Sequence, residues 1–378
     1  MPPSPTAAIV YLGRDSAQGE RRRVESWTSI LEASGYSVEG LPLLRDFRRV
    51  APAPSDVKLL LEGTITPEAL LWDHTRLIHT LNVMAPALVI GVTARAWHPV
   101  LEKGAWSSLL DLCDRLSVSY AERSDINPWT LHALRCRVLA PAHKRFEDSA
   151  RKAPTPRVAA GWTDAQWLGA RWIPNVTTLR PVSNDEVDHD LCFVGKLEYP
   201  PNLQALQILD AAWPLIRTKR PQTTLLVAGA GPAPTVERMA QTNGWTVVTD
   251  FPDLVEVERR APIAVIPLLT ASGIQTKVLE AAALGRAVIS TPAALAGFAP
   301  GFPTLLTGAS PDELAAAILR LVDDRTLQLD LSGRAAEVVD REYRPDHWVE
   351  ILQQLLGATT PVPNRDDNGQ VVQFAGTE

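Results

Sequence analysis

A carboxylate at position 280 stands in an otherwise apolar stretch of the chain. Glu280 follows Lys277 by three residues and is surrounded by valine, leucine and alanine from 278 to 284. A helix that is apolar on nearly every side is normally buried, and an unpaired buried charge is costly. Glu280 therefore needs either solvent or a partner. The alternatives for that partner are a salt bridge, for example to Arg286, and the paired hydroxyls of a bound ligand.

A short loop before Lys277 adds a second kind of chemistry. A glycine in such a loop lets a ligand approach the backbone closely, and the free amides at a helix N-terminus attract anions. Lys277 and Glu280 share one face of the helix, so a cation, amides and a carboxylate would lie together. The alternative is an ordinary surface ion pair. The loop consists of Ser272, Gly273, Ile274, Gln275 and Thr276.

The flanking elements must position these groups. Apolar runs predict a buried strand over Ile263–Leu269, a helix over Lys277–Leu284 that stops at Gly285, and a strand over Ala287–Ser290. Three further polar or glycine-rich segments directly follow predicted strands. In parallel sheets, ligands bind beyond the carboxyl ends of strands, so we expect all of these segments on one rim. They are Gly195-Lys196, Gly229-Ala-Gly231 and Asp250-Phe251.

Strand-like and helix-like segments alternate along most of the chain, which predicts an α/β fold with two doubly wound, Rossmann-like domains facing each other across a cleft. A polar, proline-bearing stretch at 175–190 reads as the linker. Thr163 to Gln166 has the pattern of a capping box, and Asn202 that of an N-cap. The other predicted strands are Ala8–Leu12, Val38–Leu43, Leu70–Asp73, Ala87–Thr93, Arg157–Gly161, Arg171–Pro174, Leu191–Leu197, Thr224–Ala228 and Val247–Thr249. The other predicted helices are Glu20–Ser34, Leu131–Arg151, Leu203–Arg217, Asp312–Val322, Leu327–Val339 and Trp348–Leu356.

Length and patterning also predict the division of the chain. At 378 residues, two domains are expected. The predicted parts are an N-terminal domain (1–176), a C-terminal domain (177–340), a helix that returns to the N-terminal domain (341–357) and a disordered tail (358–378).

Composition narrows the class of partner. The net charge of −6 gives no reason to expect nucleic acid or an anionic membrane, and no apolar run is long enough for a membrane helix. Peripheral membrane contact lacks a basic amphipathic stretch to support it. The three cysteines are widely spaced and suggest neither disulfides nor a zinc site. With no visible signal peptide, we expect a cytoplasmic protein.

The segment 190–325 resembles the retaining glycosyltransferases of family 4. Their signature, Glu-Gly-x6-Glu before a small-residue helix, is matched by Gly273 and Glu280, whereas Ser272 takes the place of the first glutamate. The stretch from Phe193 to Asn202 is similar to the FxGxxxYPPN segment of a bacterial exopolysaccharide-type subgroup. Lys196 matches the first cation of the family's diphosphate clamp, and Pro201 replaces the second.

The resemblance implies a GT-B fold and metal-independent transfer from a nucleoside-diphosphate sugar of UDP or GDP type to an acceptor hydroxyl, without a further cofactor. Lys196 and Lys277 would stabilise the leaving diphosphate, and Glu280 would hold the ribose hydroxyls. Gly195 and the loop from Ser272 to Thr276 would line the phosphate and sugar pocket. Asp250 and Phe251 would contact the base.

The N-terminal half resembles the family weakly. Gly19 corresponds to a glycine loop near the donor phosphate and acceptor, and Arg95, Trp97 and His98 follow a strand after which relatives place a sugar-side histidine. Trp97 could stack on a sugar or belong to the core. The departures at Ser272 and Pro201 leave a rival class open, namely a degenerate glycosyltransferase-like binding or partner subunit. A sugar-nucleotide epimerase would need acid–base residues that the sequence does not display.

Overall fold

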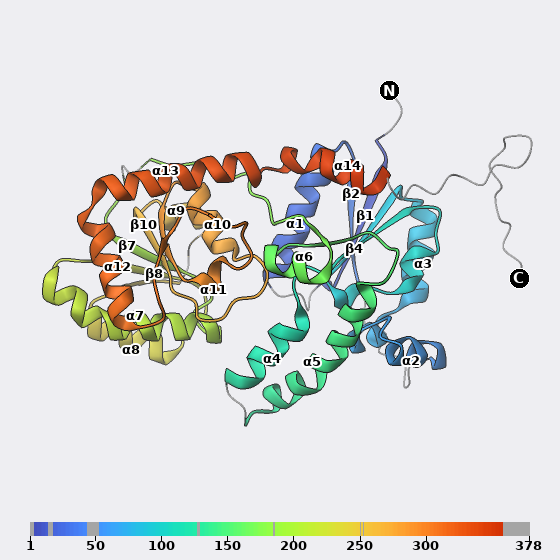
Figure 1. The fold of residues 1–378 in the computed structure, drawn as a ribbon, viewed down its shortest axis with the longest axis horizontal. Coiled ribbons are helices and arrows are strands. Elements are labelled where there is room, and N and C mark those ends of the chain that lie inside the picture. Colours follow the sequence, from blue (N-terminus) through green and yellow to red (C-terminus); the bar gives the residue numbers. More distant parts are fainter. Residues whose placement is uncertain are drawn as a thin grey trace, which may run out of the picture.

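The chain forms two parallel β-sheets, each flanked by helices (Figure 1). The structure is a computed structural model and describes residues 4–13, 18–43, 53–126, 129–183, 186–249, 251 and 253–357. The predicted tail from 358 and the candidate residue Asp250 lie outside the described residues. Two doubly wound units were expected from the alternation of strands and helices, and this fold class is confirmed.

The first sheet has six parallel strands in the order β2-β1-β3-β4-β5-β6. The strand order reverses between β1 and β3, so the carboxyl ends of these two strands border a crevice. The residues that follow them include the segment from Thr93 to Trp97. The strands are β1 (Thr6–Tyr11), β2 (Ser37–Pro42), β3 (Leu88–Val92), β4 (Ser107–Asp111), β5 (Arg157–Ala159) and β6 (Arg171–Trp172).

The second sheet has the order β12-β11-β10-β7-β8-β9, which is the strand order of the doubly wound dinucleotide-binding fold. Its reversal lies between β7 and β10. Gly195-Lys196 follows β7, and the loop that leads to Lys277 follows β10, so the topology itself brings both predicted segments to one crevice. The strands are β7 (Leu191–Val194), β8 (Leu225–Ala228), β9 (Thr246–Val248), β10 (Ile263–Ile266), β11 (Ala287–Ser290) and β12 (Leu305–Leu306).

Helices and 3-10 turns connect and cover the strands. In the N-terminal half these are α1 (Gln18–Ala33), α2 (Pro54–Leu61), η2 (Pro67–Leu71), α3 (His74–Met84), η3 (Ala94–Ala96), η4 (Pro99–Glu102), α4 (Leu116–Ile126), α5 (Leu131–Ala150) and α6 (Trp162–Leu168). In the C-terminal half they are α7 (Pro200–Lys219), α8 (Pro234–Asn243), α9 (Leu254–Glu258), α10 (Thr276–Ala283), α11 (Pro292–Leu295), α12 (Pro311–Asp323), α13 (Arg325–Glu342), η5 (Pro345–Trp348) and α14 (Val349–Gly357).

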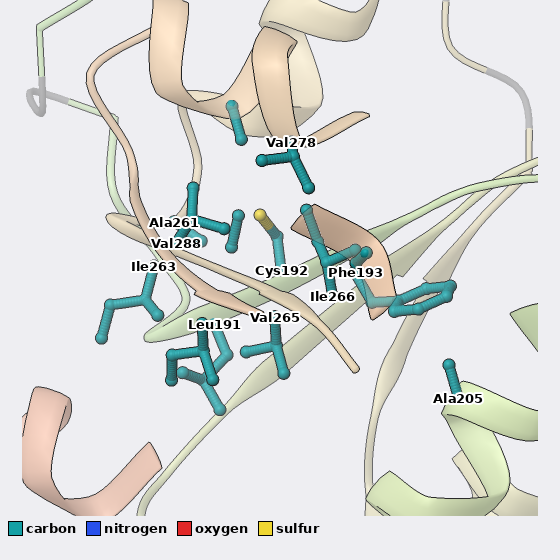
Figure 2. Packing of buried hydrophobic residues seen from close by; sticks show 14 of the residues in the cluster. Leu191, Cys192, Phe193, Ala205, Ala261, Ile263, Val265, Ile266, Val278 and Val288 are labelled. Atoms are coloured by element: carbon teal, nitrogen blue, oxygen red, sulfur yellow. The ribbon is translucent and has the colours of Figure 1, made fainter. Parts of the chain in front are cut away.

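The core of the C-terminal half fixes α10 on its sheet. Residues of β7, β10 and β11 are almost completely buried because helices cover both faces of the sheet. Figure 2 shows Cys192 of β7 pointing toward Val278 of α10, whereas Leu191 and Val265 point to the opposite side. This alternation along the strands holds the predicted helix with Lys277 and Glu280 against the sheet.

The last helices join the two halves. After α13, the chain crosses back to the N-terminal half, where η5 and α14 pack against α1 (Figure 1). Trp348 and Leu352 are buried in one cluster with Trp27 and Ile30 of α1.

Three sequence predictions are wrong in their local detail. Leu70–Asp73 is not a strand, because the segment folds into η2, which Pro67 starts. Thr163 does not cap α6; Gly161 precedes that helix, and the Thr163 hydroxyl donates to Ala296 O. Asn202 does not cap α7, because Pro200 already begins the helix after Tyr199.

Candidate functional site

Glu280 lies on α10 and faces the N-terminal half. Its neighbours on the helix are buried in the core, and its own carboxylate accepts from Arg22 Nη2 of α1 over 3.0 Å. Burial raises the pKa of Glu280 to about 7, although the Arg22 guanidinium acts in the opposite direction. The partner of this carboxylate is thus a cation from the other half of the chain.

The alternative partner, Arg286, is excluded by the geometry. Its guanidinium donates to three backbone carbonyls, at Leu284, Val182 and Ala261. Arg286 therefore ties the linker to the end of α10 and the start of β10. It does not neutralise Glu280.

Lys277 is half-buried on the same helix and is held by an amide. Its Nζ donates to Asn202 Oδ1 over 2.7 Å and lies 5.1 Å from the centre of the Phe193 ring. Asn202 Nδ2 donates in turn to Lys196 O over 2.9 Å. A Cβ at Gly195 would lie 2.8 Å from Lys277 Nζ, so any side chain at position 195 would displace the ammonium group.

The charge of Lys277 is only partly compensated. Burial lowers its pKa to about 8, although the carboxylates of Glu258 and Glu280 favour the charged form. Glu258 is itself buried, and burial raises its pKa to about 7. A cation held in this way gains from any additional negative charge that enters the crevice.

The loop before α10 is covered by the N-terminal half. Gly273 N donates to Asp164 Oδ2 of α6 over 3.2 Å, and Asn175 Nδ2 donates to Thr276 Oγ1 over 3.3 Å. Burial, with a second contribution from the nearby Asp114, raises the pKa of Asp164 to about 7. The amide that was predicted to meet a ligand therefore already meets a carboxylate of this chain.

On its other side, the same loop packs so closely against Gly297 and Gly161 that neither position has space for a side chain. A Cβ at Gly297 would lie 2.6 Å from Ile274 Cα, and Gly297 O accepts from Trp162 N over 2.9 Å. A Cβ at Gly161 would lie 3.2 Å from Gly273 Cα. Three glycines thus let the two halves meet backbone to backbone.

Gly297→Ala is expected to lower the free energy of unfolding by about 1–3 kcal/mol, because the added methyl would meet backbone that cannot turn aside. Urea denaturation followed by tryptophan fluorescence measures the change. Gly333→Ala is the matched control, because no atom lies within 4 Å of its added methyl in the helix α13. That variant should be neutral or slightly more stable. Equal midpoints for Gly297→Ala and the wild type would contradict the packing argument.

A pocket of about 190 Å³ opens beside Glu280, between the two halves. Residues of α1, the linker, α9 and α10 form its walls. A pocket between domains, with convergent polar groups, is the usual place for a small-molecule ligand. Its lining comprises Arg22, Glu25, Ser26, Ser29, Val176, Thr177, Thr178, Leu179, Asp253, Leu254, Thr276, Leu279 and Glu280.

Other predicted donor-side residues lie further from this centre. The Lys196 side chain is about half exposed, and its Nζ pairs with Glu198 Oε1 over 2.6 Å. Phe251 is half-buried and packs against the core of the C-terminal half. Ser272 O accepts from the side chain of Gln275 over 3.1 Å, which closes the loop on itself.

Of the four predicted acceptor-side residues, the structure brings two together. Gly19 lies in the first turn of α1, beside Glu20, and Glu20 Oε2 lies 3.5 Å from Arg95 Nη2. Trp97 is buried in the core against Gly91, so it has no face free for a sugar. His98 stacks on His74 with the ring centres 3.9 Å apart. The stacking role of Trp97 is therefore corrected to a core role.

Several residues of the site were missed from the sequence. Arg22, Asp114 and Asp164 come from the N-terminal half, where the patterns pointed only to helices and turns. Arg23, next to Arg22 on α1, forms a buried ion pair in which its Nε donates to Asp111 Oδ2 over 2.6 Å. A signal did exist in the run of three arginines at 21–23.

Comparison with known proteins supports this placement. Residues 188–324 match the family model described as glycosyl transferases group 1, and this segment contains Lys196, Lys277 and Glu280. No curated protein matches the chain with significant sequence similarity.

The whole fold has relatives of known structure. Sucrose-phosphate synthase of Thermosynechococcus elongatus is similar with a TM-score of 0.64 and 16% identity, over 94% of this chain and 100% of that one. Anabaena HepE in complex with UDP gives 0.62 and 13%, over 93% and 100%. For TarM of S. aureus the values are 0.59 and 12%, over 75% of this chain, which spans 58% of TarM's length. The fold is therefore GT-B, and the segment that matches the glycosyl transferases group 1 model lies in its C-terminal half.

Proposed function

We propose that this protein is a retaining glycosyltransferase of family 4 that moves a sugar from a nucleoside-diphosphate sugar to an acceptor hydroxyl. The observation that carries the proposal is the position of Lys277 and Glu280 on one helix. A half-buried ammonium and a half-buried carboxylate project from α10, at the point where the strand order of the sheet reverses. Such a site can hold both an anionic leaving group and hydroxyl groups.

The two side chains have different tasks in this proposal. Lys277 stabilises the negative charge that develops on the departing diphosphate, because Asn202 holds its ammonium in a fixed place. Glu280 accepts hydrogen bonds from the ribose hydroxyls. Gly195 and the backbone from Gly273 to Thr276 line the pocket for the phosphates and the sugar. Lys196, at the rim, guides the diphosphate into the crevice.

The N-terminal half (1–176) binds the acceptor in this proposal, and the C-terminal half (177–340) binds the donor. Gly19 and Arg95 line the acceptor side, with Glu20 between them. Asp164 and Asp114 lie opposite Gly273, where the transferred sugar would lie. A carboxylate from the N-terminal half would then occupy the place left by Ser272, which lacks the family's first glutamate.

The relatives guide the choice of donor. HepE is known in complexes with UDP and with UDP-glucose, and TarM in a complex with UDP. We therefore propose a UDP-sugar as the first donor to test and a GDP-sugar as the second. Cys113, Cys136 and Cys192 are free thiols, which supports a reducing compartment such as the cytoplasm.

A second candidate is a subunit that binds nucleotide sugars without transferring them. Two observations favour it, namely the pairing of Lys196 with Glu198 and the presence of Pro201 where the family has the second clamp cation. In this candidate the diphosphate would bind at Lys277 but would not be activated to leave.

Calorimetry with UDP, GDP and uridine, followed by assays of donor turnover, separates these functions. We expect one diphosphate to bind at least about tenfold more tightly than uridine, because the ammonium of Lys277 attracts the negative charge of the phosphates. NMR of the released or transferred sugar should show the anomeric configuration of the donor. Binding without turnover of any UDP- or GDP-sugar would favour the second candidate. A protein that binds neither diphosphate would refute both.

A further inference from the structure

We propose that the tip of the α4–α5 hairpin docks onto the surface of a bilayer that contains anionic lipids. The two helices pack along each other and project from the N-terminal half at the lower centre of the view (Figure 1). We use the name hairpin tip for six residues at the far end of this projection: Trp129, Leu131, Leu134, Arg135, Arg137 and Val138.

The apolar side chains of the hairpin tip are exposed far beyond what is usual for their types. The exposed fractions are 94% for Trp129, 86% for Leu131, 57% for Leu134 and 66% for Val138. Isolated exposed apolar residues are common on protein surfaces, but a contiguous group marks an interaction surface. Here four of them fall within ten residues of sequence.

The positions on α5 form an amphipathic pattern on the solvent side of the helix. With about 3.6 residues per turn, Leu131, Leu134 and Val138 lie along one stripe, and Arg135 and Arg137 fall on its two flanks. The opposite side of α5 is buried through Ala133, Cys136 and other residues. The helix therefore has a second apolar stripe that nothing in the described chain covers. The sequence pattern hid this stripe, because it is short and lies opposite the core-facing one.

Charge identifies the occupant. The charged residues of the hairpin tip are Arg135 and Arg137, and the sequence has neither aspartate nor glutamate between Trp129 and Phe146, whereas the whole chain has a net charge of −6. An acidic protein with a local basic and apolar surface is oriented by an anionic plane. A tryptophan at the end of such a surface suits the boundary between headgroups and acyl chains.

A second copy of the chain fits this surface poorly. A symmetric dimer through the hairpin tip would bring the same patch of both molecules together, so that Arg135 and Arg137 of one copy would approach those of the other. Like charges at an interface oppose association. Among the helices that the structure describes, none is long and apolar enough to cross a membrane. The proposed contact is therefore one in which the hairpin rests on the lipid surface.

Cosedimentation with vesicles tests the proposal on the full chain. We expect binding to vesicles of phosphatidylcholine mixed with phosphatidylglycerol, weaker binding to phosphatidylcholine alone, and a decrease with added salt. The double variant Trp129→Ser with Leu131→Ser should lower the partition coefficient at least about tenfold, because it removes the two most exposed apolar side chains. Arg135→Gln with Arg137→Gln should lower it by a similar factor on the anionic vesicles only.

Matched controls come from other exposed apolar residues. Leu61 on α2 and Val83 on α3 are 72% and 75% exposed, so Leu61→Ser with Val83→Ser removes comparable apolar surface elsewhere. This variant should bind vesicles as the wild type does. All variants should keep the melting temperature and the nucleotide affinity of the wild type, since none touches the core or the crevice.

Three results would overturn the proposal. The first is a wild-type protein that stays in the supernatant with anionic vesicles, and the second is tip variants that bind them as well as the wild type does. The third is sedimentation velocity without lipid that shows a dimer in the wild type and a monomer in the tip variants, because the tip would then be a contact between two copies. The outcome is independent of the proposed sugar transfer, which is measured with soluble donors.

Discussion

Lys277→Met is expected to lower the rate of sugar transfer by about 10²–10³-fold, because the charge on the departing diphosphate would lose its buried cation. Methionine has a similar length and fits beside Phe193 without an ammonium group. Burial lowers the pKa of Lys277 to about 8, so the charged lysine costs folding free energy at neutral pH. The variant should therefore melt at the same temperature as the wild type or higher.

Steady-state turnover and calorimetry together test this expectation. Lys219→Met is the matched control, because Lys219 is exposed in the last turn of α7 and far along the chain from the crevice. The affinity for UDP or GDP should fall in Lys277→Met, whereas the affinity for the corresponding nucleoside should not. A variant with wild-type turnover would remove Lys277 from the mechanism.

Glu280→Gln should weaken the binding of the nucleoside diphosphate by about 10–100-fold at pH 8, because hydroxyl donors lose a charged acceptor. Glutamine keeps the size of the side chain, so the packing of α10 is preserved. Glu337→Gln, on the exposed side of α13, is the matched control for the loss of one carboxylate.

The dependence on pH sharpens the test of Glu280. Burial raises its pKa to about 7, so the carboxyl group is mostly protonated at pH 6 and mostly ionised at pH 8. Since the ionised form accepts from hydroxyls, the wild-type affinity should rise about tenfold relative to the glutamine variant over this interval. The ligand's own titrating phosphate is the same in both measurements, so its contribution cancels in the comparison. A constant ratio of affinities from pH 6 to pH 8 would contradict the assignment.

The architecture was predictable because the buried strands of a parallel sheet are continuous apolar runs. Ile263–Ile266 and Ala287–Ser290 have this pattern, and Gly285 ends the helix between them with φ of 75°. The strand Ser107–Asp111 was missed, since its two serines and terminal aspartate dilute the pattern. The helices α2, α3 and α4, which are 8, 11 and 11 residues long, were missed as well.

The site was predictable only on the donor side. Lys277 and Glu280 are conspicuous because charged residues in an apolar helix need solvent or a partner of opposite charge. Asn202 was seen, but it was taken for a helix cap, and its role in holding Lys277 depends on a contact over 75 positions of sequence. Arg22 and Asp164 belong to the opposite half, so only the folded chain brings them to α10. For Trp97 the sequence left two alternatives open, and its burial in the core cluster favours the core role over stacking on a sugar.

The ion pair between Arg22 and Glu280 has a consequence for ligand choice. A molecule that takes over the Glu280 carboxylate with neutral hydroxyls leaves the Arg22 guanidinium with Glu25 alone, whose Oε2 lies 3.0 Å from Arg22 Nη1. A bare nucleoside does not replace the lost carboxylate, whereas a phosphate within reach of Arg22 would. Arg22 thus favours ligands that carry their own anion over bare nucleosides.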